Sequence, residues 1–135
     1  MSPSTDRIYT KPLIDKLGVR PDSRVALVGS FAEDFRKMLC GRTQSVVEGV
    51  EGESVDLIFV TADSVEELGR LKQLRDHIVS KGAIWIVSRK GKQATIRDTD
   101  VIAASIDAGL VDNKVVSFSD THTALRAVIR LRDRK

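Results

Sequence analysis

Three cationic side chains surround Gly91 directly after an apolar run at 83–87 that predicts a buried strand. Ligands of open α/β sheets bind outside the carboxyl ends of the strands, and guanidinium and ammonium groups are strong donors to anionic ligands. A solvated surface loop is the alternative, because runs of charge usually face water. The sequence nevertheless offers a candidate anion-binding site at Ser88, Arg89, Lys90 and Lys92.

A second group of candidates follows the other predicted strands. A helix that begins just after Gly29 would offer free N–H groups to a phosphate. Glu33 and Asp34 argue against a phosphate there, because they already place negative charge at that helix N-terminus. Their positions at the carboxyl ends of strands make the following residues candidates for binding a cofactor: Gly29, Ser30, Phe31, Glu48, Thr61 and Asp63.

Side chains suited to covalent, acid–base or metal chemistry are few. An acid stands near His122 in Asp120-Thr121-His122, but Asp and Thr are also ordinary turn formers. Cys40 ends an amphipathic helix, where packing is its commoner role. The two histidines and one cysteine show no metal-ligand spacing. We therefore expect no metal site and name no catalytic residue.

Strands and helices alternate along the chain, which predicts a parallel sheet covered by helices. We expect a capping box at Ser30 and Glu33, with Gly41 ending that helix, and a second capping box at Ser64 and Glu67. The second helix should run on to Gly82. Continuous or alternating apolar residues predict strands at 24–29, 46–48, 55–61, 83–87, 114–118 and 124–132.

The last two strands should be antiparallel, because 119–123 is too short for a parallel crossover. Residues 124–132 also fit a helix, but their alternation favours a strand whose arginines protect a sheet edge. The predicted fold is a three-layer Rossmann-like α/β sheet, mostly parallel, with an antiparallel C-terminal strand. We expect one domain over 1–135, with residues 1–8 flexible. Residues 49–54 are unusually few for a parallel connection.

Composition excludes several classes of protein. The longest apolar runs are far shorter than a membrane span of about 20 residues. A single cysteine forms no internal disulfide, which favours a cytoplasmic location. The formal net charge of +3 is well below the concentrated positive field of a nucleic-acid binder. Weak nucleic-acid binding through the C-terminal arginines and the 89–92 loop stays a minor alternative.

The segment from Lys16-Leu17-Gly18 to the strand that ends at Gly29 resembles the lead-in to a class I methyltransferase domain. That resemblance implies S-adenosylmethionine as a cofactor, held near Gly29 and a second-strand acid such as Glu48. The glycine-rich turn of that fold is missing, since Phe31 and Asp34 stand where glycines would be needed. The cofactor is therefore disfavoured.

A narrower resemblance rests on Tyr9-Thr10-Lys11-Pro12-Leu13, on Gly109-Leu110-Val111-Asp112-Asn113-Lys114-Val115 and on Leu125-Arg126. These segments are similar to a bacterial domain-of-unknown-function family of small stand-alone proteins with a reduced methyltransferase fold. We expect a non-catalytic protein that binds a partner protein or an anionic small ligand. The alternative is a methyltransferase-like enzyme or subunit that uses S-adenosylmethionine or a nucleotide.

Overall fold

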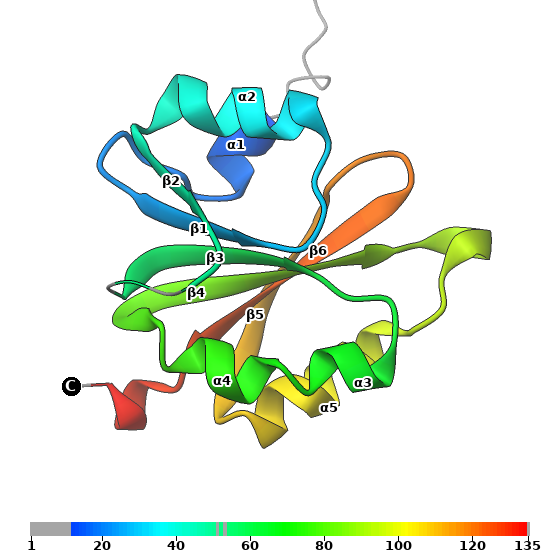
Figure 1. The fold of residues 1–135 in the computed structure, drawn as a ribbon. Helices are drawn as coiled ribbons and strands as arrows, with labels where there is room; N and C mark the ends of the chain where they lie inside the picture. Colours follow the sequence, from blue (N-terminus) through cyan, green and yellow to red (C-terminus); the bar gives the residue numbers. More distant parts are fainter. Residues whose placement is uncertain (1–11, 51, 53, 135) are drawn as a thin grey trace, which may run out of the picture.

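A twisted six-stranded sheet forms the centre of the computed structural model, which describes residues 12–50, 52 and 54–134 (Figure 1). The predicted flexible residues 1–8 lie outside these ranges. The strand order is β2-β1-β3-β4-β6-β5. The strands are β1 (Arg24–Val28), β2 (Ser45–Glu48), β3 (Val55–Thr61), β4 (Ile78–Arg89), β5 (Leu110–Ser117) and β6 (His122–Ile129).

The sheet is parallel from β2 to β4, and β6 runs antiparallel to both of its neighbours, β4 and β5. This arrangement confirms the predicted Rossmann-like fold with an antiparallel C-terminal strand. It also shows that the predicted role of the C-terminal arginines as an edge guard is wrong. β6 is an inner strand, and a short 3₁₀-helix, η3 (Leu131–Asp133), follows it.

Two helix layers cover the sheet (Figure 1). α1 (Leu13–Lys16) and α2 (Glu33–Arg42) lie on one face, and α3 (Val65–Leu68), α4 (Leu71–Arg75) and α5 (Asp98–Asp107) lie on the other. Each face has its own apolar cluster, one around Trp85 and Phe59 and one around Ile58 and Ile84. Trp85 is fully buried, and its indole N–H donates to the Leu17 carbonyl at 3.1 Å. That bond fixes the end of α1 to the sheet.

The described residues of the connection from β2 to β3 form no helix. Both strands pair in parallel with β1, so the six residues 49–54 cross β1 from one side to the other. Six extended residues reach about 20 Å, which is enough for this crossing. Val50 packs against the apolar cluster on the α3–α5 face. The sheet therefore ends at β2.

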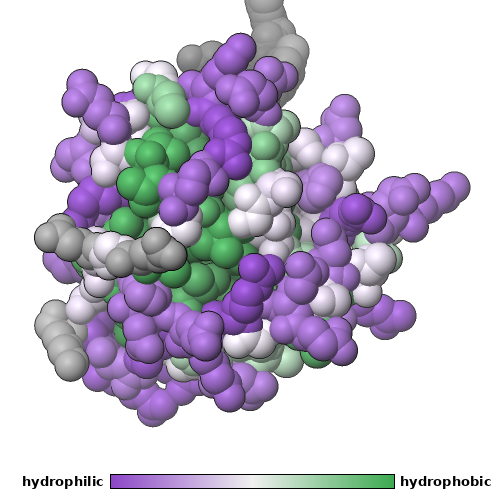
Figure 2. Space-filling model, viewed as in Figure 1, coloured by the Kyte–Doolittle hydropathy of each residue, from purple (hydrophilic) through white to green (hydrophobic). Residues whose placement is uncertain are grey.

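The edge at β2 leaves apolar surface open to solvent. Val47 on this strand is 50% exposed. Figure 2 shows apolar surface in the middle of the view, between the two helix layers. Among the described residues, no helix has the length and apolar character that a membrane crossing requires.

Two predicted helix boundaries are wrong, and one capping prediction is confirmed. α2 begins at Glu33 after Ala32, which makes no side-chain cap, so the Ser30 capping box does not form, and Gly41 lies inside the helix. The Ser64 hydroxyl does accept from the Glu67 N–H at 3.1 Å.

The helix predicted to run from Ser64 to Gly82 is also wrong, because it divides into α3 and α4 and gives way to β4 at Ile78. The pairing of β3 with β4 jumps there, from Val55 opposite Ile78 to Leu57 opposite Ala83. A Cβ on Gly82 would come within 2.7 Å of the Asp56 carbonyl. Glycine at 82 therefore lets the irregular start of β4 pass close to β3, and it does not cap a helix.

Gly82→Ala should lower the free energy of unfolding by about 1–3 kcal/mol, the usual cost of forcing an extra group into a packed site. Gly41→Ala is the matched control, because open space surrounds that position within α2. It should leave stability unchanged or raise it by about 0.5–1 kcal/mol. Urea unfolding followed by circular dichroism measures both changes. Equal stability of the two variants would contradict the close approach at Gly82.

Candidate functional site

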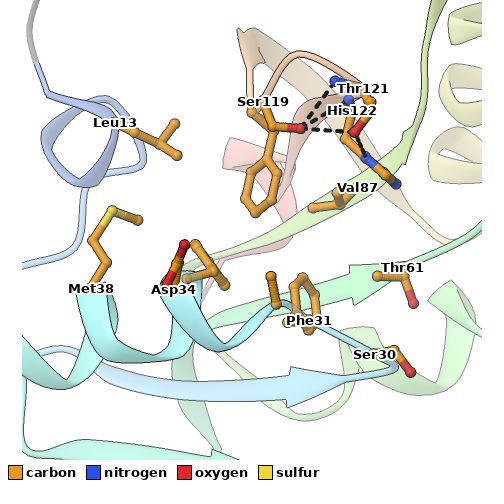
Figure 3. A pocket seen from close by; sticks show the side chains of 13 residues that line it. Leu13, Ser30, Phe31, Asp34, Met38, Thr61, Val87, Ser119, Thr121 and His122 are labelled. Atoms are coloured by element: carbon orange, nitrogen blue, oxygen red, sulfur yellow. Dashed lines mark hydrogen bonds between the residues drawn. The ribbon is translucent and has the colours of Figure 1, made fainter.

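A cavity of about 390 Å³ opens at the carboxyl ends of β1, β3 and β4, between α2 and the β5–β6 hairpin (Figure 3). Its floor comes from the parallel strands and its two walls come from segments far apart along the chain. The lining residues are Leu13, Ser30, Phe31, Ala32, Asp34, Phe35, Met38, Thr61, Val87, Phe118, Ser119, Thr121 and His122.

Aromatic rings form much of the apolar wall. The ring of Phe35 lies 5.3 Å from that of Phe31 and 4.8 Å from that of Phe118, between ring centroids. On its other side Phe35 meets Phe59 edge-on at 5.2 Å, and Phe59 in turn stacks on Trp85. The wall is therefore a continuation of the buried core, which holds its rings in fixed orientations.

The β5–β6 turn supplies polar groups at the mouth (Figure 3). The Ser119 hydroxyl accepts from the N–H groups of Thr121 and His122, at 3.2 and 3.1 Å. The Thr121 hydroxyl lies 2.8 Å from Nδ1 of His122. These bonds rigidify the turn and leave Nε2 of His122 without a hydrogen-bond partner among the described residues.

Three of the six cofactor candidates meet at this cavity. Ser30 and Phe31 enter from the β1–α2 loop, and Thr61 enters from the end of β3. Gly29, Glu48 and Asp63 do not line it. Each of those three makes an intramolecular interaction that accounts for its residue type.

Gly29 meets the side chain of Thr61. Its φ is +107°, and a Cβ there would stand 2.0 Å from Oγ1 of Thr61. Only glycine combines this backbone angle with so close a neighbour. The hydroxyl of Thr61 thus lies against the backbone of Gly29, where a Cβ would otherwise stand.

Glu48 forms an ion pair with Arg36 of α2. The guanidinium binds both carboxylate oxygens of Glu48, and its Nε donates to the Phe31 carbonyl at 3.4 Å. The hydrogen bond to Glu48 raises the pKa of Arg36. The carboxylate lines a separate hollow at the sheet edge, where Val47 and Gly49 also lie.

Asp63 ties two loops together. Its carboxylate accepts from the Arg89 backbone N–H at 3.1 Å and stands 3.9 Å from the guanidinium of the same residue. Its carbonyl accepts from the Thr95 hydroxyl. This acid therefore holds the segment after β4 against the β3–α3 turn.

The four anion-site candidates do not converge on one point. Ser88 is buried within β4, and Arg89 pairs with Asp63. Nζ of Lys90 donates to the Ser117 hydroxyl at 2.7 Å, while Lys92 lies exposed in the 3₁₀-helix η2 (Gly91–Gln93). None of them lines the cavity.

The sequence did not predict the wall of the cavity that the β5–β6 hairpin forms. The β5–β6 turn lines the cavity with Phe118, Ser119, Thr121 and His122. It lies next to the end of β4 because β6 pairs with β4. The only local signal was the triplet Asp120-Thr121-His122. Within the described ranges, no group of three or more His, Cys, Asp or Glu side chains is placed to hold a metal ion.

Gly29→Ala should destabilise the protein by about 2–4 kcal/mol. The alanine would have to adopt a positive φ, and its Cβ would overlap Oγ1 of Thr61. Thr61→Ala removes the overlapping hydroxyl. The double variant should therefore recover part of the loss, and thermal or urea unfolding of the two single variants and the double variant measures the coupling. Strictly additive losses would contradict the contact.

Comparison with known proteins identifies the fold. No protein-family model and no curated protein sequence matches the chain. Among solved structures, a SAM-dependent methyltransferase from Aquifex aeolicus superposes with a TM-score of 0.66 at 17% identity, covering 87% of this chain and 88% of that one. A TehB-like SAM-dependent methyltransferase from Corynebacterium glutamicum has a TM-score of 0.56 at 12% identity, covering 87% and 85%.

A third similar structure was solved with bound ligands. The O-methyltransferase NcsB1 of neocarzinostatin biosynthesis, in complex with S-adenosyl-L-homocysteine and 1,4-dihydroxy-2-naphthoic acid, has a TM-score of 0.59 at 12% identity. The match covers 80% of this chain and 49% of NcsB1. At these identities the likeness concerns the fold alone. The chain has the Rossmann-like fold of the SAM-dependent methyltransferases.

Proposed function

We propose that this protein acts by binding a small, flat and mostly apolar molecule in the cavity between α2 and the β5–β6 hairpin. The observation that carries the proposal is the cavity's composition. Its volume of about 390 Å³ falls within the usual range for small-molecule sites, about 300–1,000 Å³. Phenyl rings on one wall and hydrogen-bonding groups at the mouth match a ring system with one or two polar substituents.

The polar groups at the mouth give such a ligand an orientation. His122 offers Nε2, and the hydroxyls of Ser30 and Thr121 lie on the lining as well. A substituent hydroxyl or carboxylate would bond there while the ring packs against Phe31 and Phe118. The anionic ligand predicted for the 88–92 segment is not favoured, because its cations point to separate partners.

The residues of this chain do not fit S-adenosylmethionine in the way that the fold family implies. Thr61 fills the space beside Gly29, and Arg36 neutralises Glu48. Phe31 in the β1–α2 turn and Asp34 in the first turn of α2 stand where a close backbone approach would need glycine. We derive no catalytic step through this cofactor.

A methyltransferase-like enzyme or subunit is the second candidate, and the similar structures favour it. Membership of the small stand-alone bacterial family that the sequence resembles is compatible with either candidate. A cytoplasmic location and a protein partner are compatible with both as well. The two candidates differ in what they bind. An enzyme of this kind needs an adenosyl ligand, and the proposed binding protein does not.

Calorimetric titration separates them, with 1,4-dihydroxy-2-naphthoic acid as the flat aromatic probe and S-adenosylhomocysteine as the cofactor probe. We expect saturable binding of the aromatic probe and none of the adenosyl probe. Phe118→Ala should weaken the affinity for the aromatic probe by about three- to tenfold, because an aromatic contact of about 1 kcal/mol is lost.

Val47→Ala is the control, because that side chain is exposed at the far edge of the sheet. It should leave the affinity unchanged. Saturable binding of S-adenosylhomocysteine without binding of the aromatic probe would overturn the proposal and support the enzyme.

A further inference from the structure

A further cavity, of about 210 Å³, lies at the end of α1 and shares no lining residue with the aromatic cavity. On the sheet, Arg126 of β6 stands between Trp85 of β4 and Lys114 of β5 in the strand register. Paired residues of neighbouring strands point to the same face. The lining residues are Asp15, Lys16, Leu17, Gly18, Asn113, Lys114 and Arg126.

Arg126 is partly buried, yet it makes no hydrogen bond or ion pair with any described residue. Burial lowers the pKa of its guanidinium, and the nearby charge of Arg134 lowers it further. Lys16 and Lys114 add two more cations to the same lining. A partly buried arginine among like charges costs stability unless an anion joins it.

Three acceptors near this cavity already have donors. The Lys16 carbonyl accepts from Nζ of Lys114 at 2.9 Å, and the Leu17 carbonyl accepts from Trp85. The carboxylate of Asp15 lies 2.8 Å from Nη2 of Arg42, which neutralises it. None of these three acceptors bonds to Arg126.

We propose that this cavity binds the phosphate group of a small molecule, with Arg126 as its principal contact. Guanidinium, ammonium and amide donors from Arg126, Lys114 and Asn113 surround one small volume, as a tetrahedral oxyanion with several acceptor oxygens requires. The bend in β5 between Asp112 and Lys114 brings Asn113 into the lining. The group could be free phosphate or part of a phosphate monoester, which share this chemistry.

Trp85 gives a direct readout, because it is the sole tryptophan of the chain and donates to Leu17 in the cavity wall. Titration with inorganic phosphate and with glycerol phosphate, at constant ionic strength, should change its fluorescence saturably. Calorimetry should give one site per chain. Tighter binding of the ester would assign the site to a phosphorylated metabolite, and tighter binding of phosphate would assign it to the free ion.

Arg126→Met keeps the aliphatic length of the side chain and removes the charge. It should weaken phosphate binding by about tenfold or more, as expected for a lost charge-assisted hydrogen bond. Arg126→Lys should keep part of the affinity. The control is Arg132→Met, since Arg132 is exposed in η3 and pairs with Asp133.

The unfolding curve of Arg126→Met checks the fold independently. Because an unpartnered and partly buried charge is removed, the variant should be at least as stable as the wild type in phosphate-free buffer. Unchanged phosphate affinity in this folded variant would overturn the proposal. So would binding of a single-stranded oligonucleotide when neither phosphate compound binds.

Discussion

The six residues between β2 and β3 constrain the rest of the structure. They join two strands that pair with opposite sides of β1, and Val50 packs onto the α3–α5 face. The sheet ends at β2, and among the described residues no further strand pairs with that edge (Figure 1). In this fold, ligands bind at the carboxyl ends of the strands. The aromatic cavity at these strand ends lies on the side of the β5–β6 hairpin.

Polar residues along the carboxyl edge of the sheet mostly satisfy one another. Thr61 meets Gly29, Arg36 binds Glu48, and Arg89 binds Asp63. What remains open there is apolar and aromatic. The opposite situation holds around Arg126, which shares a cavity lining with Lys16 and Lys114 and has no partner among the described residues. The first arrangement suits a flat apolar ligand and the second suits an oxyanion.

The sequence predicted the fold well because its signals were local and mutually consistent. Buried apolar runs marked β1, β3 and β4, and the Ser64 cap marked α3. The boundaries failed where tertiary contacts decided them, as at Gly82, which serves the approach of β4 to Asp56. Only part of the cavity was predictable. Ser30, Phe31 and Thr61 follow from strand ends, whereas the hairpin wall depends on β6 lying between β4 and β5.

The central claim is that the aromatic cavity, and not an adenosyl site at Gly29 and Glu48, is the binding site. The chain has two methionines, Met1 and Met38, and the latter lines the cavity. Methyl NMR of methionine-labelled protein tests the claim directly. We predict that 1,4-dihydroxy-2-naphthoic acid shifts the Met38 methyl resonance saturably and that S-adenosylhomocysteine leaves the spectrum unchanged. Saturable shifts with S-adenosylhomocysteine, either at the Met38 methyl or at the backbone amides of Gly29 and Glu48 in a ¹⁵N-labelled sample, would contradict the claim.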